Sequence, residues 1–259
     1  EQDSGYGRGK SGAKGEVAAP DLPYQPRDPE SYRPAIGLIG CGGISEMHLR
    51  AYKNAGYDVA ALCSRDRARA EGRRDEFYPE ADIYLDYRDL LARDDIEVVD
   101  ITPHPEERVP ILAAAIDAEK HILSQKPFVV DLDVGEALVA RADARGVKMA
   151  VNQNGRWAPH FSYMRQAVAA GLVGKVQSVQ FAVHWDHNWI AGSAFDEVED
   201  LVLYDFGVHW FDMVLALLRD EKPQKVYASA RRSAGQEAKP PLLAQAVIEC
   251  ASAQASIFF

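Results

Sequence analysis

The sequence predicts an α/β fold in which a doubly wound parallel sheet is followed by an α+β domain. From residue 35 onward, short apolar runs alternate with segments that have the spacing of amphipathic helices. This alternation is typical of a parallel sheet with helices on both faces. After about residue 155 the pattern changes, and long strand-like runs follow one another, which favours a mostly antiparallel open sheet. We therefore expect a first domain over 35–155 and a second over 156–259.

The elements of the first domain are delimited by Gly, Pro and Asp between the apolar runs. Pro105 suits the first turn of a helix, and Gly146 suits the end of another. Helices are expected at about 44–55, 66–77, 86–93, 106–118 and 132–145. Strands are expected at 35–40, 57–63, 96–101, 120–124 and 147–152.

The second domain is expected to have few helices to cover its sheet. Such an exposed apolar face usually marks an interface, so we expect a homodimer or homotetramer joined through residues 175–259. Because the chain ends within an expected strand, we also expect the domain to continue beyond Phe259. The expected helices cover 158–170 and 201–218, the strands 175–185, 224–232, 242–250 and 253–259, and the apolar side chains to bury include Val226, Ala228, Val247 and Ile257.

Residues 1–34 differ from the rest, because glycines and then prolines dominate and few aliphatic side chains lie between them. This composition predicts a disordered tail. The alternative is an extended arm that packs on another subunit, with Tyr24 and Tyr32 as anchors.

The bulk composition excludes several classes of protein. A net charge of −10 argues against a nucleic-acid partner. The sequence contains no apolar run long enough to span a bilayer. Cys41, Cys63 and Cys250 are too few and too scattered for a disulfide framework, which favours a reducing cytoplasm.

The most informative stretch is the glycine-rich turn after the first expected strand. Gly40 and Gly42 permit a tight turn and a close approach of the backbone to a pyrophosphate, and Ser45 is small enough for the helix to pack on the strand. The following helix offers free N–H groups to phosphates. This pattern predicts a Rossmann-type dinucleotide site, and the alternative is a purely structural turn. The expected cofactor contacts here are Gly40, Gly42, Gly43, Ile44 and Ser45.

The end of the second expected strand indicates which dinucleotide is bound. An acidic residue at this position accepts from the ribose hydroxyls of NAD, whereas an arginine accommodates the 2′-phosphate of NADP. Ser64 and Arg65 occupy the position, with Asp66 just beyond. We favour NADP, because a guanidinium grips phosphate in a bidentate manner. The alternative is that Arg65 is solvated and Asp66 binds the ribose of NAD.

Three polar residues are candidates for chemistry. Lys126 follows a strand directly, at the edge where ligands of such sheets bind. Asp205 and His209 are four apart, so on a helix they share a face and can form a pair in which the carboxylate orients the imidazole. By residue type alone, Lys126 is as readily a solvated surface lysine, and an Asp–His pair of this spacing is more often structural.

The segment 184–189 is dense in polar and aromatic residues. On a strand, His184 and Asp186 would face one way and Trp185 and His187 the other, so their convergence on a metal ion is poor, and we expect no metal site. Packing of the tryptophans in the core is one alternative. We favour a wall facing carbohydrate, because aromatic faces cover sugar C–H groups while His and Asn bond hydroxyls.

Taken together, these features resemble the glucose–fructose oxidoreductase/inositol dehydrogenase (Gfo/Idh/MocA) family over about residues 35–259. The motifs that carry the resemblance are the glycine turn, Lys126-Pro127 after a strand, and Asp205-x-Gly207-x-His209-x-x-Asp212. Further matches are Thr102-Pro103 and the run Asn152-x-Asn154-x-Arg156-Trp157-x-Pro159. The resemblance implies an NAD(P)-dependent dehydrogenase of a sugar, cyclitol or related polyol whose second-domain sheet pairs subunits.

The resemblance also assigns roles to individual residues. His209 would remove the proton of the substrate hydroxyl, Asp205 would orient the His209 imidazole, and Lys126 would hydrogen-bond the hydroxyl oxygen. Whether Lys126 or His209 is the base stays open. There are two alternatives. One is a related enzyme that oxidises a sugar transiently and eliminates a substituent, and the other is a non-catalytic nucleotide sensor. Further cofactor contacts are expected at Thr102, Pro103, His104, Gln125, Lys126 and Asn154, and substrate contacts at Lys126, Arg156, Trp157, His184, Asp186, Asp205 and His209.

The sequence departs from the family pattern at two positions. Gln125 stands where the family usually has Glu, which removes a charge but keeps a hydrogen-bonding side chain. Glu107 stands where a histidine is common, and His104 lies near enough in sequence to take its place.

Overall fold

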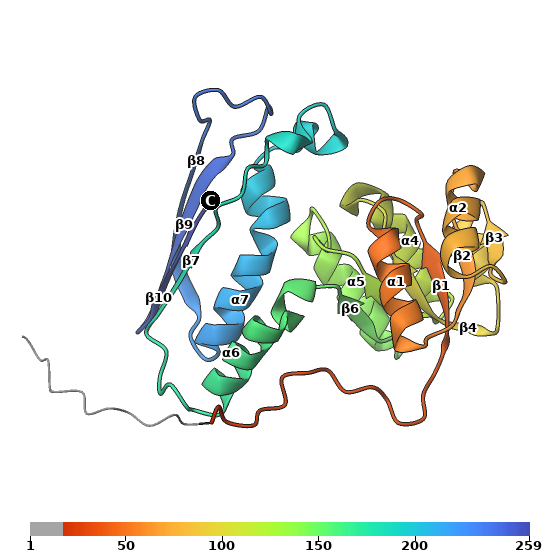
Figure 1. The fold of residues 1–259 in the computed structure, drawn as a ribbon, viewed down its shortest axis with the longest axis horizontal. Helices are drawn as coiled ribbons and strands as arrows, with labels where there is room; N and C mark the ends of the chain where they lie inside the picture. The colour runs from red at the N-terminus through yellow and green to blue at the C-terminus, as the bar shows by residue number, and fades with distance from the viewer. Residues whose placement is uncertain (1–17) are drawn as a thin grey trace, which may run out of the picture.

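The computed structural model describes residues 18–259. The first half of the predicted tail, residues 1–17, therefore lies outside the described residues. The chain forms two sheets, each with its own helices, which lie beside one another (Figure 1).

The first sheet is parallel throughout and has the order β3-β2-β1-β4-β5-β6. The order reverses between β1 and β4, and ligands of doubly wound sheets bind beyond the carboxyl ends of the strands at such a point. The short strand β3 was not predicted. The strands are β1 (Ala35–Ile39), β2 (Val59–Cys63), β3 (Asp82–Tyr84), β4 (Ile96–Ile101), β5 (His121–Ser124) and β6 (Met149–Val151).

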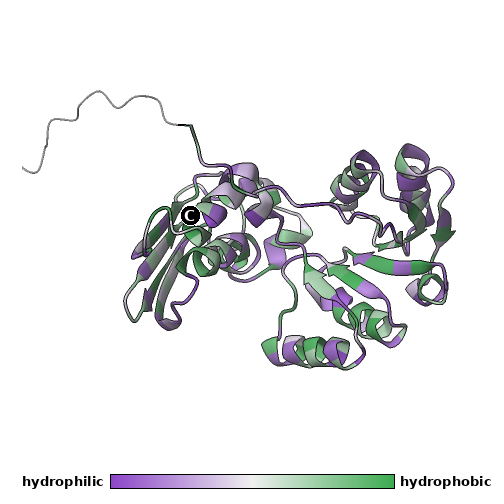
Figure 2. Cartoon of the chain, turned by 90° about the horizontal axis from the view of Figure 1, so that it is seen from below, coloured by the Kyte–Doolittle hydropathy of each residue, from purple (hydrophilic) through white to green (hydrophobic). Residues whose placement is uncertain are grey.

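Helices cover this sheet on both sides, and the strands between them are largely hydrophobic (Figure 2). Leu38 on β1 and Ile101 on β4 are fully buried, and burial of each side chain contributes about 2 kcal/mol. Asp66, Asp86 and Asp131 accept backbone N–H groups at the starts of three helices. The helices are α1 (Ser45–Ala55), α2 (Arg67–Phe77), α3 (Tyr87–Leu91), α4 (Pro105–Asp117) and α5 (Leu132–Ala144).

The second sheet has the order β7-β10-β9-β8. β10 runs parallel to β7 and antiparallel to β9, and β9 is antiparallel to β8, so the sheet is mixed but mostly antiparallel. Helices α6 and α7 lie on one face of it (Figure 1), where Met213 and Val214 pack with Ile257. The elements are α6 (Pro159–Ala169), β7 (Ser178–Ala182), α7 (Val208–Leu218), β8 (Pro223–Arg231), β9 (Leu243–Cys250) and β10 (Gln254–Phe258).

Two predicted elements of the second half were wrong in extent. β7 is five residues long rather than spanning 175–185, because β10 pairs with it only from Ser178 to Ala182. The helix predicted over 201–218 is divided into a π-helical turn, η4 (Val202–Phe206), and α7. Short 3-10 turns, η1 (Asn154–Trp157), η2 (Asn188–Ile190) and η3 (Ala194–Glu197), complete the connections.

The four apolar side chains that we expected the second sheet to bury do not all lie on one face of it. Ile257 is fully buried on the α7 side. Val226 and Ala228 pair directly with Ile248 and Ala246, so by register they belong to that same side, but both are exposed, Val226 at 64%. Among the four predicted residues only Val247 lies on the outer face, beside exposed Tyr227.

Residues 18–34 run as an extended arm past both units (Figure 1). At one end the backbone oxygen of Tyr24 accepts a hydrogen bond from Ser162 on α6 (2.5 Å), and the Tyr24 ring meets Tyr163 edge-on. At the other end the Tyr32 hydroxyl donates to Glu97 on β4 (3.2 Å). The two predicted tyrosine anchors therefore hold the arm to its own chain. Within residues 18–259, no helix is both long and apolar enough to cross a membrane.

Candidate active site

The glycine turn at the carboxyl end of β1 is held from one side by the turn that follows β4. Gly40 has φ +102°, and a Cβ there would lie 2.5 Å from Thr102 Oγ1, so only glycine fits. Thr102 Oγ1 in turn donates to the backbone oxygen of Gly40 (2.7 Å). Ser45 is fully buried and donates to the Gly42 oxygen (2.6 Å), which closes the turn onto α1.

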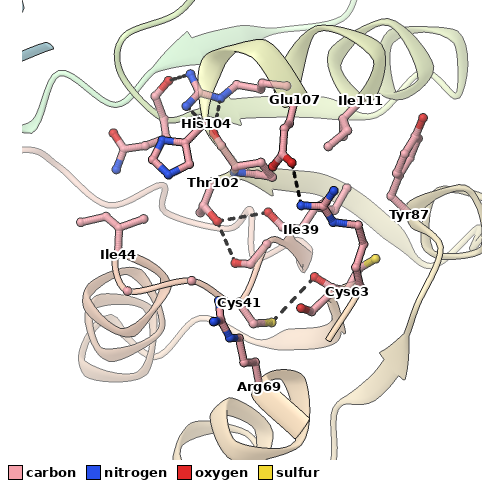
Figure 3. A pocket seen from close by; sticks show the side chains of 18 of the residues that line it. Ile39, Cys41, Ile44, Cys63, Arg69, Tyr87, Thr102, His104, Glu107 and Ile111 are labelled. Carbon is pink, nitrogen blue, oxygen red and sulfur yellow. Dashed lines mark hydrogen bonds and ion pairs between the residues drawn. The ribbon is translucent and has the colours of Figure 1, made fainter. Parts of the chain in front are cut away.

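A cavity of about 700 Å³ opens in front of this turn, lined by the ends of β1, β2, β4 and β5. A side chain at Gly42 or Gly43 would meet no described atom within 4 Å, so the backbone is open to a ligand there. Thr102 and His104 line one side of the cavity, with Cys41 and Arg69 opposite (Figure 3). The open glycine backbone and the cavity at the sheet's switch point fit a dinucleotide. Of the predicted residues, the cavity lining includes Gly40, Gly42, Gly43, Ile44, Ser64, Arg65, Thr102, Pro103, His104, Gln125, Lys126 and Asp205.

The rim after β2 carries two guanidinium groups. Arg65 is 83% exposed and donates to Glu107 across the cavity (2.6 Å; Figure 3). Arg69 pairs with Asp66 (3.2 Å). Asp66 also accepts the backbone N–H of Arg69 as the cap of α2, so its carboxylate is already engaged by its own helix.

Gln125 belongs to a buried network that the sequence did not reveal. Its Oε1 accepts the backbone N–H of Lys126 (2.6 Å), so its amide nitrogen faces His48 Nε2 (3.2 Å). His48 Nε2 must then accept, and its Nδ1 donates to Asp100 (2.6 Å). A Glu carboxylate at position 125 could only accept a hydrogen bond here, whereas the Gln125 amide donates one to His48 Nε2.

Lys126 reaches from the first unit to the second. Its Nζ donates to Asp205 Oδ2 (2.9 Å) and to the Asp205 backbone oxygen (3.1 Å). Both side chains are largely buried, at 19% and 11% exposed. An ammonium has three donors, so one remains for a ligand oxygen.

The predicted Asp205–His209 hydrogen bond was wrong. The Gly207 N–H bonds the Val202 oxygen, five residues back (2.6 Å), so this turn is wider than an α-helical one and residues four apart no longer align. Asp205 turns to Lys126 instead. His209 Nδ1 is buried without a partner among residues 18–259, and a Cβ on Gly155 would lie 3.3 Å from it.

The pKa of the His209 imidazole is shifted even without a hydrogen bond to Asp205. Burial lowers its pKa below the ordinary value, and the nearby Lys126 ammonium lowers it further. His209 is therefore neutral at physiological pH and able to accept a proton.

The junction residues are fixed by neighbouring side chains. Arg156 donates to both oxygens of Asp212, through Nε at 2.8 Å and through Nη2, and this bond raises its pKa. Trp157 is 48% exposed, with the Arg165 guanidinium 5.0 Å from its ring centre. Asn154 begins η1, next to Gly155, which packs against His209. Arg156, Trp157, Asn154 and His209 lie outside the lining of the 700 Å³ cavity.

Two family models match the chain in order. Residues 35–153 match "Oxidoreductase family, NAD-binding Rossmann fold", and residues 161–258 match the "GFO/IDH/MocA C-terminal domain". The chain belongs to the Gfo/Idh/MocA family.

Curated relatives of this family member include two kinds of dehydrogenase. D-apiose dehydrogenase from Paraburkholderia graminis is 28% identical over 71% of this chain and 49% of its own length. Inositol 2-dehydrogenase from Salmonella typhimurium is 28% identical over 74% of this chain and 56% of its own length. The chain thus spans about half the length of the curated relatives it matches.

Solved structures share the fold of this Gfo/Idh/MocA chain. An oxidoreductase from Agrobacterium radiobacter, in complex with NAD+, L-tartaric acid and magnesium, superposes with a TM-score of 0.77 at 22% identity, over 88% of this chain and 66% of the other. Apo scyllo-inositol dehydrogenase from Lactobacillus casei gives 0.77 at 19% identity, over 87% and 68%.

The predicted strand geometry of segment 184–189 was wrong, because β7 ends at Ala182, residues 183–187 are irregular, and η2 begins at Asn188. His184 and Asp186 are exposed and do not line the cavity. The aromatic residues nevertheless gather: His187 stacks on Phe206 (4.3 Å), and Trp189 lies 6.1 Å from Phe195. Phe195 itself lines the cavity, so this cluster extends outward from it.

One buried charged residue that lines the cavity of this family member escaped prediction. Arg108 on α4 is 1% exposed, and burial lowers its pKa to about 10. A single arginine within a helical pattern is usually solvated, so no signal in the sequence marked it.

Proposed function

We propose that this protein is an NAD(P)-dependent dehydrogenase that acts on a hydroxyl carbon of a sugar, cyclitol or related polyol. The observation that carries the proposal is the meeting of Lys126 with Asp205 at the cavity of the glycine turn, where Lys126 also lowers the pKa of His209. A nucleotide sensor needs only the glycine turn and gives no reason for this arrangement.

The chain's own residues divide the proton chemistry. The bound nicotinamide supplies a hydride acceptor at its C4. His209, neutral because of burial and Lys126, takes the hydroxyl proton. The third donor of Lys126 bonds the same oxygen and stabilises the negative charge that develops on it. Asp205 holds the Lys126 ammonium in place rather than the imidazole.

We propose NADP as the cofactor. Arg65 and Arg69 both line the cavity after β2, and Asp66 is engaged in capping α2. Two guanidinium groups beside Ser64 suit a 2′-phosphate. The Glu107 carboxylate competes for Arg65, so NADP must displace this ion pair.

The aromatic cluster supports a polyhydroxylated substrate. Trp185 and Trp189 are 66% and 54% exposed and lie 6.5 Å apart. Exposed indole faces beside the cavity suit the C–H faces of a sugar ring. His184, Asp186, Arg156 and Trp157 stay proposed as substrate contacts that a bound ligand would have to engage outside the cavity lining.

The test is a panel of polyols and aldoses assayed with NADP+ and NAD+ by the absorbance of reduced nicotinamide. We expect net reduction with at least one compound, and a loss of about 10²- to 10³-fold in kcat for Lys126→Met and for His209→Ala. Lys148→Met, at an exposed position on the same unit, is the control. Elimination products without net reduction of the nicotinamide would favour the alternative in which the sugar is oxidised only transiently. Near-normal turnover in both variants would refute the mechanism.

We further propose a homodimer or homotetramer joined through the outer face of the second sheet. Tyr227, Leu243 and Phe258 are 61%, 50% and 44% exposed there. A stable monomer with full activity in light scattering would contradict this assembly. We also propose a cytoplasmic location, because unpaired cysteines such as these three are typical of a reducing compartment.

A further inference from the structure

Arg108 connects two turns that both line the cavity. Its Nε and Nη2 donate to the Pro103 oxygen (3.0 and 2.6 Å), in the turn after β4. Its Nη1 donates to the oxygens of Gln125, Pro127 and Phe128, in the turn after β5. Every acceptor is a backbone carbonyl.

The guanidinium has no compensating carboxylate within 4 Å in the described part of the chain. A buried cation without a partner is costly unless its hydrogen bonds replace water. Arg108 achieves this with a planar fork of five donors that reaches both turns at once, which a lysine ammonium cannot reproduce. The cation is therefore bound by these two turns rather than by an ion pair.

Each turn carries part of the active site. The turn after β4 presses against the glycine turn, since a Cβ on Gly40 would lie 2.9 Å from Pro103 Cδ. The turn after β5 carries Lys126, whose Nζ extends to Asp205. The separation between the cofactor turn and the Lys126 ammonium thus depends on how the two turns are joined.

We infer that Arg108 is a positioning residue that fixes the Gln125–Phe128 turn against Pro103 and so places Lys126 Nζ beside Asp205 and the reacting oxygen. That Arg108 anchors the turn after β5 follows from its hydrogen bonds alone. Its consequence for turnover rests on the proposed function.

The test compares Arg108→Met and Arg108→Lys with Leu112→Ala. Leu112 is fully buried one turn further along α4 and packs in the core, so its truncation destabilises the same helix without removing the hydrogen bonds of Arg108 to the two turns. Hydrogen–deuterium exchange of cofactor-free protein reports the Gln125 and Lys126 amides, which bond Ile101 O and Gln125 Oε1. Steady-state kinetics report kcat and KM.

We expect both Arg108 variants to exchange these two amides at least tenfold faster than wild type and to lose at least tenfold in kcat with a smaller change in cofactor KM. Leu112→Ala should leave the turn amides and the kcat of the folded protein near wild type. If Arg108→Met fails to fold, Arg108→Lys carries the test, because it keeps the charge and the aliphatic stem. Wild-type exchange at Gln125 and Lys126 in a folded Arg108 variant, or an equal effect of Leu112→Ala, would overturn the inference. An inactive wild type would refute the proposed function while the exchange data still decided the role of Arg108.

Discussion

Removing the Lys126 ammonium tests the link between the two units. Lys126→Met leaves the Asp205 carboxylate, only 11% exposed, without its cation at 2.9 Å. Breaking a buried pair from one side costs about 3–5 kcal/mol. Because Asp205 keeps some contact with solvent, we expect a loss near the lower end, about 3 kcal/mol, or a fall in Tm of roughly 6–12 °C for a chain of this size.

A double-mutant cycle isolates the pair from the packing of the lysine stem. Asp205→Asn leaves Lys126 its bond to the backbone oxygen of residue 205, so we expect a loss of about 1 kcal/mol. In Lys126→Met/Asp205→Asn no charge is left unpaired, so the double variant should be more stable than Lys126→Met, with a coupling of about 1–3 kcal/mol.

The assay is thermal unfolding followed by circular dichroism on cofactor-free protein, with Lys148→Met as the exposed-lysine control. The reasoning would be refuted if Lys126→Met unfolded within 2 °C of the control, or if the double variant were no more stable than Lys126→Met.

Three further outcomes follow from the same geometry. In a fluorescence titration, Arg65→Ala should weaken NADP binding at least tenfold more than NAD binding, and Glu107→Gln should strengthen NADP binding by freeing Arg65. Equal losses of affinity for both cofactors in Arg65→Ala would instead favour Asp66 as the residue that recognises the ribose. The pKa of His209 lies below its ordinary value, so below about pH 6.5 the unfolded chain binds more protons than the folded chain, and the free energy of unfolding falls as pH falls. His209→Asn should reduce this dependence of the free energy of unfolding on pH, measured by urea denaturation. An unchanged dependence would contradict the lowered pKa. Gly40→Ala should cost about 2–4 kcal/mol through its φ of +102° and the contact with Thr102, and calorimetry showing wild-type stability would contradict the fit of the turn.

The parallel sheet was predictable because its signals are local. Apolar runs such as 96–101 and cap residues such as Asp66 mark elements without reference to the rest of the chain. Strand β3 was missed because three residues are too few to show a period. β7 was overextended because its length depends on pairing with β10, which is a long-range property.

The site divides in the same way. The glycine turn and Lys126 could be placed from sequence, since position at the end of a strand determines where each residue lies. The partner of Asp205 could not be predicted, because it depends on a π-helical turn whose extra residue leaves no periodic trace between Val202 and Gly207. Arg108 escaped because its role is set by carbonyls about 20 residues away along the chain.

The extended arm sets a geometric limit on motion between the two units. Tyr24 is held on α6 and Tyr32 on β4, eight residues apart in the chain. A fully extended chain of that length spans at most about 28 Å, and Pro26 and Pro29 within it restrict the backbone to stiff, extended conformations. The arm therefore sets an upper limit on how far α6 and β4 can move apart while both tyrosines keep their contacts.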